Sequence, residues 1–326
     1  MNVAKKFPVK NIKNIKKYVE LLNIKLKNGE FKLTYRSCIC CKQNSEKILF
    51  NNDRYGINLK ILMCKVCGFV YQNPRIDEES LIKFYESDLY RDIHSSVDNY
   101  QYKWKLAKSY KKKKLQLQNY DPFGFVDFIE ESKIKYKSVF EIGAAGGANL
   151  LPFKGLNKQV GGNELSKKLI KFANTKGIKL LYSNLDSIPL NIDLLIIQHV
   201  LEHLFDPEKL LRHIYKKNVN YLYIGVPGFV NVMPKVQLAH NFYFSFNTLI
   251  SICVRNGFKP IKKAIYNSNN YLMVLFERQN KIEEYEYNYS SEVKNITKIY
   301  NNFRIKTFLL PIYKFLKINK INEKFR

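Results

Sequence analysis

The sequence has no apolar run long enough to cross a membrane. A spanning helix needs about 20 mostly apolar residues, and no such stretch occurs among the 326 residues. The first twenty residues are basic and have no apolar core, so they are not expected to form a secretory signal. Without a secretory route, the glycosylation sequons at Asn288 and Asn295 have no role. We therefore expect a cytoplasmic protein.

Acidic residues are scarce relative to basic ones. The chain has 28 Asp and Glu against 55 Lys and Arg, a net charge of +27. Such an excess can bind the phosphates of nucleic acid, a nucleotide-linked substrate or an anionic membrane. However, lysine dominates over arginine and is spread along the whole chain beside abundant Asn, Ile and Tyr, as a bias toward A/T-rich codons also produces. A solvated lysine-rich surface is the simpler interpretation, and a phosphate-binding surface is the alternative.

Cysteine is almost confined to one segment, since residues 37–75 hold five of the six. Four of these form two Cys-x-x-Cys pairs separated by 22 residues: Cys38, Cys41, Cys64 and Cys67. This spacing is typical of a tetrahedral zinc site with a small β-ribbon between the pairs. Disulfides are disfavoured in the cytoplasm, and a redox Cys-x-x-Cys needs a thioredoxin-like βαβ unit that is absent here. A closed four-thiolate site has no open coordination position, so we expect structural zinc. Cys40 is a spare thiol that can compete as a ligand, and Cys253 is expected in the core.

Residues 139–149 read VFEIGAAGGAN: an apolar strand ending in an acid, a glycine-rich turn and the start of a helix. Such a turn lets the backbone approach a ligand closely at a helix N-terminus. Gly143, Gly146 and Gly147 can adopt positive φ or leave room where a side chain would collide with the ligand. A second acid, Glu164, ends the next apolar strand. A carboxylate there typically accepts the ribose hydroxyls of a nucleoside-bearing cofactor.

The first acid indicates which cofactor this is. Glu141 stands two residues before the first glycine, and the turn lacks the Gly-x-Gly-x-x-Gly spacing of dinucleotide sites. A carboxylate facing the turn suits a positively charged cofactor without a pyrophosphate, which describes S-adenosylmethionine. Residues 192–204, IDLLIIQHVLEHL, follow with a buried strand and the motif HVLEH. From Glu141 to Phe258 the chain resembles the class I S-adenosylmethionine-dependent methyltransferases.

The resemblance implies an α/β protein with a Rossmann-like class I methyltransferase fold. Its mostly parallel seven-stranded sheet has helices on both faces, and here a small zinc-ribbon-like module and a helical lead-in precede it. The alternation of strands and helices from residue 137 agrees with a parallel sheet. Strands are expected near 137–142, 159–164, 179–183, 192–198, 221–226, 259–266 and 271–278. Helices are expected near 147–155, 166–176, 206–217 and 247–256, the third capped by Asp206-Pro207-Glu208.

The resemblance also implies a set of cofactor-binding residues. It places Glu141 under the turn toward the methionine part, Asn184 or Asp186 at the adenine edge, Leu185 as apolar cover, and the post-strand segment beside the methionine. The full set is Glu141, Gly143, Ala144, Gly147, Glu164, Asn184, Leu185, Asp186, Gln198, His199 and His203. His199 and His203 also have metal-ligand spacing on a helix. The resemblance accounts for them without metal, so metal is the minor alternative.

The stretch from Cys64 to Tyr90 carries a further resemblance, to the zinc module and helical lead-in of bacterial methyltransferases in sugar and surface-glycan pathways. With it, the similarity covers roughly residues 38–278. In that group a tyrosine-bearing helix covers the substrate, which makes Tyr85 and Tyr90 candidates here. The segment QLAHNFYFS resembles a His-Glu-His segment of sugar C-methyltransferases, with His240 at the second histidine. Leu238 and Ala239 replace the first histidine and the glutamate, which puts C-methylation in doubt.

His240 is the candidate base, because neutral imidazole can take a hydroxyl proton near neutral pH. The simpler interpretation is that it caps the following helix or packs on aromatic neighbours. The expected function is methyl transfer to oxygen or carbon of a sugar, a nucleotide-sugar or a surface glycan. The alternative is an rRNA or tRNA methyltransferase that grips RNA with the zinc module and basic surface. The basic segments are rich in lysine and lack an arginine–aromatic platform, so nucleic acid is the less expected partner.

The chain thus divides into a basic helical leader (1–36), the zinc-binding module (37–75), a helical substrate cover or linker (76–135), the S-adenosylmethionine-binding domain (136–280) and a basic helical tail (281–326). In the tail, residues 303–325 combine an apolar stripe with lysines, a pattern that suits peripheral contact with anionic lipid at the inner face of the membrane. The alternative is a helix packed on the protein's own domain.

Overall fold

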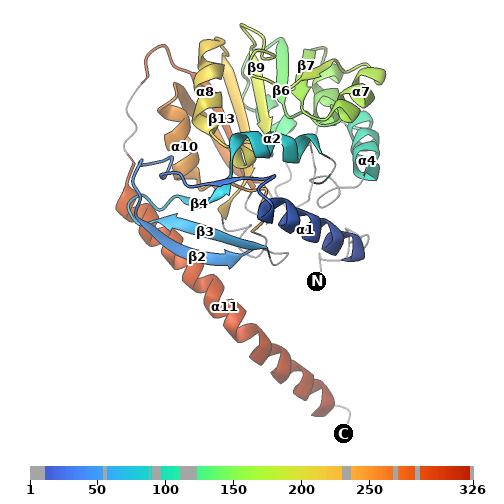
Figure 1. The fold of residues 1–326 in the computed structure, drawn as a ribbon. Helices are drawn as coiled ribbons and strands as arrows, with labels where there is room; N and C mark the ends of the chain where they lie inside the picture. Colours follow the sequence, from blue (N-terminus) through green and yellow to red (C-terminus); the bar gives the residue numbers. More distant parts are fainter. Residues whose placement is uncertain are drawn as a thin grey trace.

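The computed structural model describes residues 12–53, 57–87, 89, 97–110, 123–229, 236–266, 271–282 and 287–323. Side chains are described over the same residues apart from 12–16, 97–100 and 308–323. Figure 1 shows a larger α/β part, a smaller sheet beneath it and a long C-terminal helix that leaves the body of the protein.

The larger part is built on a seven-stranded sheet with the order β12-β13-β10-β9-β6-β7-β8. The strands are β6 (Ser138–Ile142), β7 (Gln159–Glu164), β8 (Leu180–Tyr182), β9 (Leu194–Gln198), β10 (Tyr221–Pro227), β12 (Phe258–Tyr266) and β13 (Tyr271–Arg278). Only β13 runs antiparallel to its neighbours in this sheet. The predicted mostly parallel sheet is confirmed, and each predicted strand lies within about two residues of its observed bounds.

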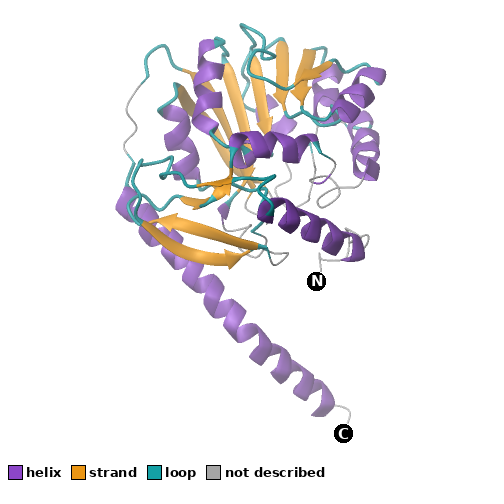
Figure 2. Ribbon diagram, viewed as in Figure 1, coloured by secondary structure: helices purple, strands orange, loops and turns teal. Residues whose placement is uncertain are grey.

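Helices cover both faces of this sheet because its central strands are apolar on both sides (Figure 2). Along β9, Leu195 and Ile197 pack with α8 (Pro207–Lys216) and α10 (Phe246–Val254). Leu194 and Ile196 point the other way and share a core with the helices of the second face. These are α4 (Val97–Lys108), α5 (Gly124–Glu130), α6 (Leu151–Gly155) and α7 (Lys167–Thr175).

Helix starts follow from local sequence where capping side chains are available. Asp206 accepts the amide of Lys209 at 3.0 Å and precedes a proline, so the predicted cap of α8 is confirmed. The helix expected over 147–155 differs from its prediction. It is a 3-10 helix, Ala148–Leu150, followed by the short α6. Pro152 has no amide hydrogen to donate and therefore stands in the first turn of the new helix.

The smaller sheet has the order β11-β4-β3-β2, with β2 (Glu46–Asn52), β3 (Asn58–Cys64), β4 (Val70–Gln72) and β11 (Phe242–Tyr243). Its β2–β3 hairpin is the ribbon predicted between the cysteine pairs. The strand β11 follows the seven-stranded sheet's β10 in sequence, far from the cysteine module, and pairs antiparallel with β4. A shorter pair, β1 (Leu33–Thr34) with β5 (Arg75–Ile76), lies beside it. The cysteine module and the methyltransferase-like part therefore share a sheet, which a two-residue strand could not reveal in sequence.

Arg255, at the end of α10, also joins these parts. Its guanidinium donates to the carbonyl oxygens of Cys40 at 2.5 Å and Ile39 at 3.1 Å, and to the Glu208 carboxylate at 2.9 Å. Burial acts to lower the pKa of Arg255, but the charge and hydrogen bond of Glu208, together with the effects of Cys40, raise this pKa on balance. The first cysteine knuckle is thus held against the helices of the larger sheet by a charged side chain.

The remaining helices are α1 (Ile12–Lys27), α2 (Glu78–Glu86) and α11 (Tyr289–Glu323). The beginning of α11 packs on the cysteine module. Tyr300 donates to the carbonyl oxygen of Leu49 at 2.6 Å, and the Phe50 and Phe303 rings lie 6.0 Å apart. The self-packed alternative therefore holds for this part of the tail. The apolar side chains expected to contact lipid, from Phe308 onward, lie outside the described residues. No described helix is both long and apolar enough to cross a membrane.

Candidate functional site

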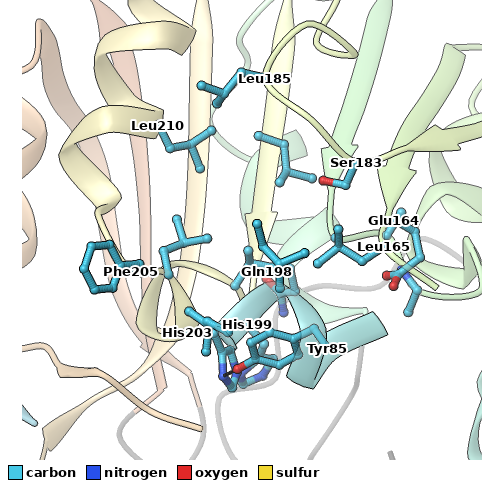
Figure 3. A pocket seen from close by; sticks show the side chains of 18 of the residues that line it. Tyr85, Glu164, Leu165, Ser183, Leu185, Gln198, His199, His203, Phe205 and Leu210 are labelled. Carbon is cyan, nitrogen blue, oxygen red and sulfur yellow. Dashed lines mark hydrogen bonds between the residues drawn. The ribbon is translucent and has the colours of Figure 1, made fainter. Parts of the chain in front are cut away.

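A cavity of about 550 Å³ opens where β6, β7 and β9 end. The turn after β6 lines one wall, and α2 contributes Leu81, Ile82 and Tyr85 to another. Figure 3 shows side chains from several elements converging on this space, with Glu164 and Ser183 at one end and Tyr85 and His203 at the other. Ligands in open parallel sheets bind at the carboxyl ends of strands, so this is the expected place for a site.

Two glycines shape the turn after β6. Gly143 has φ +67°, and a Cβ there would lie 2.6 Å from Val200 Cγ2. Gly147 has φ +77°, and its Cβ would lie 2.9 Å from Ile178 Cγ2. Both positions thus disfavour a side chain for conformational and steric reasons. Of the three turn residues assigned to cofactor binding, Gly143 and Ala144 line the cavity, whereas Gly147 is not among the lining residues.

Glu164 is brought to the cavity by the end of β7. It is 7% exposed, and its carboxylate accepts the amides of Ala145 at 3.0 Å and Ser166 at 2.9 Å. These bonds fix the carboxylate at the rim of the turn, because two backbone donors orient its two oxygens. Its position agrees with the predicted ribose contact.

Glu141 lies deeper than predicted. It is 1% exposed and is not among the residues that line the cavity. Its Oε1 accepts the side-chain amide of Asn149 at 2.7 Å, and burial raises its pKa to about 7 against the opposing effects of Asn149 and Lys103. Asn149 and Lys103 do line the cavity. Within the described residues, Glu141 thus has no direct contact with the cavity. It orients Asn149 by a hydrogen bond and interacts with the charge of Lys103.

Sequence reasoning missed the contribution of α4. Trp104 donates its indole N–H to the carbonyl oxygen of Gly146 at 2.7 Å, which seats the helix on the glycine turn. Its neighbour Lys103 then enters the cavity, where burial lowers its pKa and the charge of Glu141 counteracts this. The one tryptophan of the chain was the available signal, since a buried indole needs a partner for its N–H.

The expected adenine contacts are only partly in place. Leu185 lines the cavity as predicted, together with Ser183. Asn184 and Asp186 are exposed and are not among the lining residues. The side-chain oxygen of Asn184 accepts the amide of Ser187 at 2.6 Å, so it closes a local turn.

The motif HVLEH follows β9 and bends sharply. His199 has φ +55°, a conformation rare for a residue with a side chain, and its ring lies 4.8 Å from that of Tyr271. Gln198, His199 and His203, which the sequence assigns to cofactor binding, line the cavity. Burial lowers the pKa of His203, so its imidazole is neutral at physiological pH. Strained backbone of this kind is concentrated at functional sites.

The predicted catalytic residues divide into three cases. Tyr85 lines the cavity, and its hydroxyl lies 2.8 Å from Nδ1 of His203. His240 is 7% exposed and stands behind His203, with ring centroids 4.7 Å apart, and it is not among the lining residues. Tyr90 lies outside the described residues. Tyr85 and His203 therefore lie together at one end of the cavity (Figure 3), with the His240 ring next to that of His203.

The two cysteine pairs come together as predicted. The four ligand sulfurs lie within 4.8 Å of one another, with Cys38 to Cys67 at 3.5 Å and Cys41 to Cys64 at 3.4 Å. Four sulfurs on a zinc tetrahedron with bonds of about 2.3 Å lie about 3.8 Å apart, so the arrangement fits that ion. Cys40 is buried beside them and Cys253 lies in the core.

Residues 140–217 match the family model described as a methyltransferase domain. These residues form a methyltransferase domain. The match begins inside β6 and ends just after α8, so it contains the glycine turn, Glu164 and the HVLEH motif. The methyltransferase predicted from those features is confirmed for this domain.

Solved methyltransferase structures share parts of this fold at low identity. The magnesium protoporphyrin IX methyltransferase from Synechocystis with bound SAH is 14% identical, with a TM-score of 0.43 over 62% of this chain and 98% of its own. A possible histamine N-methyltransferase from Thermotoga maritima is 17% identical, with a TM-score of 0.40 over 56% and 96%. An S-adenosylmethionine-dependent methyltransferase from Mesorhizobium loti is 13% identical, with a TM-score of 0.40 over 47% and 97%. No match was found among curated proteins.

Proposed function

We propose that the protein transfers a methyl group from S-adenosylmethionine to a sugar-type small molecule, such as a nucleotide-sugar or a surface-glycan precursor. The observation that supports it best is that one cavity is lined by Glu164 and the glycine turn and also by the Tyr85–His203 pair. A cofactor held at the first end has its reactive part directed toward an acceptor at the second.

Three side chains would bind the cofactor's charged groups. Glu164 would accept the ribose hydroxyls, since its carboxylate faces the cavity at the end of β7. Lys103 is placed to attract the carboxylate of the methionine part. Asn149, whose side-chain nitrogen donates to Glu141, is placed to contact the ammonium. Bound there, S-adenosylmethionine supplies an electrophilic methyl group on a sulfonium.

The acceptor end of the cavity has the features of a small-molecule site. Leu81, Ile82, Leu204 and Phe205 give it apolar walls, while Tyr85 and His203 supply polar groups. A volume of about 550 Å³ lies within the range of small-ligand pockets. Lys209 lines the same end and pairs with Glu78 at 2.9 Å, which offers a cation for an anionic substrate group. An RNA substrate would require a strand-sized basic groove with stacking side chains.

Proton removal is assigned to the imidazoles at this end. Methyl transfer to a hydroxyl needs a group that accepts its proton, and an unprotonated histidine is suited to this near neutral pH. His240 remains our predicted base, and Tyr85 and His203 lie between it and the cavity.

We further propose that the four cysteines hold a structural zinc ion. The ion would fix the two knuckles that support β4, and β4 in turn holds the segment after His240 through the bond from the Gln72 amide to the Asn241 carbonyl oxygen at 2.9 Å. Cysteine thiolates close all four positions, so zinc has no part in the methyl transfer itself.

The substrate class is tested by tritiated-methyl transfer from S-adenosylmethionine into a panel of nucleotide-sugars and into total RNA. Labelling of a nucleotide-sugar by the full chain, and not by a Glu164→Ala variant, is the expected result. Labelling of RNA alone would replace the sugar proposal with the RNA alternative. Failure to label either pool, with cofactor binding intact, would point to an acceptor outside both classes.

A further inference from the structure

Glu202, His203 and His240 form a second cluster of potential metal ligands, separate from the cysteines. Each offers one ligand atom, and these atoms lie within 4.8 Å of one another. All three residues are buried, with Glu202 only 1% exposed. The first two belong to the 3-10 helix after β9, whereas His240 comes from the segment before β11. The fold therefore brings a carboxylate and two imidazoles together from distant parts of the chain.

The charge of Glu202 needs compensation. Its Oε2 is buried and accepts no hydrogen bond within the described part of the chain. In the same part, the basic groups within 4.0 Å of its carboxylate are two imidazoles, His199 at 3.4 Å and His203 at 3.8 Å. Burying a carboxylate oxygen without a hydrogen-bond donor is costly, because the lost hydration is not replaced. A cation bound between the three side chains would compensate for the hydration that the carboxylate loses.

Both histidines are held in the way that metal-binding histidines usually are. His203 donates from Nδ1 to the carbonyl oxygen of Ala239 at 2.8 Å, which turns Nε2 toward Glu202. The side-chain amide of Gln237 lies 2.6 Å from Nε2 of His240. When the amide oxygen, which has no other hydrogen bond among the described residues, is turned toward the ring, Nε2–H donates to it and Nδ1 is the nitrogen offered to a cation. A hydrogen bond from the second ring nitrogen fixes the orientation of a ligating imidazole.

The two segments that carry the ligands are also bonded to each other. Asn241 donates its backbone amide to the Glu202 carbonyl oxygen at 2.9 Å. Its side-chain amide donates to the carbonyl oxygens of His203 at 3.1 Å and Leu204 at 3.0 Å. The ligand set is thus preorganised by backbone contacts, and only side-chain rotation is needed to close it to the spacing of a coordination sphere.

We propose that Glu202, His203 and His240 bind one divalent first-row transition-metal cation beside His203, the one of the three that lines the acceptor end of the cavity. Two imidazoles and one carboxylate suit Zn²⁺, Co²⁺, Fe²⁺ or Mn²⁺ better than Mg²⁺ or Ca²⁺, which prefer oxygen ligands alone. Three protein ligands leave coordination positions open, unlike the closed cysteine site. The cation site does not depend on the sugar assignment, because it is defined by these three side chains alone.

A cation here would change the role of His240. A hydroxyl that coordinates a divalent cation has a lowered pKa and loses its proton more readily. His240 would then act as a ligand, and not as the base. The two roles exclude each other, and the metal dependence of binding separates them without any activity measurement.

The test uses the full chain with zinc on its cysteines, passed over a chelating resin to remove loosely bound metal. The protein is titrated with Co²⁺ alone by calorimetry, and absorption distinguishes nitrogen and oxygen ligation from thiolate ligation. One additional Co²⁺ without a thiolate charge-transfer band is expected. Glu202→Gln and His240→Asn should each weaken it by at least about tenfold.

Glu292→Gln is the matched control. Glu292 is also a glutamate at 1% exposure with a buried oxygen that accepts no hydrogen bond in the described chain, but it pairs with Asn247 on α10, away from the cluster. This variant should retain the additional Co²⁺. No additional Co²⁺ in the wild-type chain overturns the proposal by itself, whatever the variants do. Equal binding by the wild type and both ligand variants also overturns it.

Discussion

The hydroxyl of Tyr85 lies 2.8 Å from Nδ1 of His203, which joins α2 to the turn that follows β9. The same hydroxyl donates to the carbonyl oxygen of Ala239 at 3.2 Å. One phenol thus connects the lead-in helix, the HVLEH motif and the segment of His240. The acceptor end of the cavity is therefore lined both by the lead-in helix α2 and by the methyltransferase domain.

Replacing Glu164 tests the cofactor assignment. Charge-assisted hydrogen bonds contribute about 1.5–3 kcal/mol, so Glu164→Ala should weaken S-adenosylmethionine binding by about tenfold or more. Calorimetry measures this, and circular dichroism verifies folding, since the variant also loses the bonds to Ala145 and Ser166. Glu79→Ala, at an exposed acid of α2, is the control. Unchanged affinity in Glu164→Ala contradicts the ribose contact.

The buried Glu141 should give the protein a measurable pH dependence. Its pKa is raised to about 7 in the folded state from 4.5, so the unfolded chain ionises it first as the pH rises. The free energy of unfolding should therefore fall between about pH 4.5 and pH 7, by up to ~3 kcal/mol from this group. Glu141→Gln, which cannot ionise, should lack this fall. Urea unfolding of both proteins across the pH range measures the difference, and parallel curves would contradict the burial effect.

The cysteine site predicts tightly bound zinc. Freshly purified, reduced protein should carry a zinc ion that survives a weak chelating resin, and Cys64→Ser should lose it. Metal and folding are coupled in small modules, so hydrogen exchange should accelerate first in the β2–β3 hairpin. It should then spread to α11, because Tyr287 donates to the Cys67 carbonyl oxygen at 2.9 Å. Cys253→Ala is the control, and absence of zinc from the wild-type protein rejects the site.

His240→Ala should lower turnover while leaving cofactor affinity nearly unchanged. Loss of a general base typically reduces the rate by about 10²–10⁴-fold. The rate of tritiated-methyl transfer from S-adenosylmethionine to the acceptor gives the turnover, and calorimetry gives the cofactor affinity. His213→Ala, on α8 and away from the cavity lining, is the matched control. A reduction below about threefold would make His240 structural, with transfer relying on positioning.

The tail can be tested independently of catalysis. The contacts of α11 with the cysteine module are made by side chains up to Phe303, such as Tyr300, so removal of 308–326 should leave the body folded. Binding to anionic vesicles should then fall, and the wild-type binding should weaken with added salt, because lysines attract the lipid charge. Co-sedimentation of both proteins at low and moderate salt measures this. Equal binding by both means that the tail is ordinary structure.

Local patterns in the sequence were sufficient for the large sheet, the cysteine site and the glycine turn. Period-two apolar runs, Cys-x-x-Cys spacing and positive-φ glycines act over a few residues, so they are visible in the chain itself. HVLEH was found for the same reason, because it follows the apolar run of β9, and Glu164 was found as the acid that ends the next strand after the glycine turn.

Only the tertiary structure decided what stands beside these residues. Lys103 lines the cavity because Trp104 fixes α4 on the glycine turn. Glu141 does not line the cavity because several elements pack around it and bury it. The strands β4 and β11, well over a hundred residues apart in sequence, pair next to the segment that places His240 beside His203. Such contacts arise from packing between distant segments, and packing depends on shape and charge that no local pattern encodes.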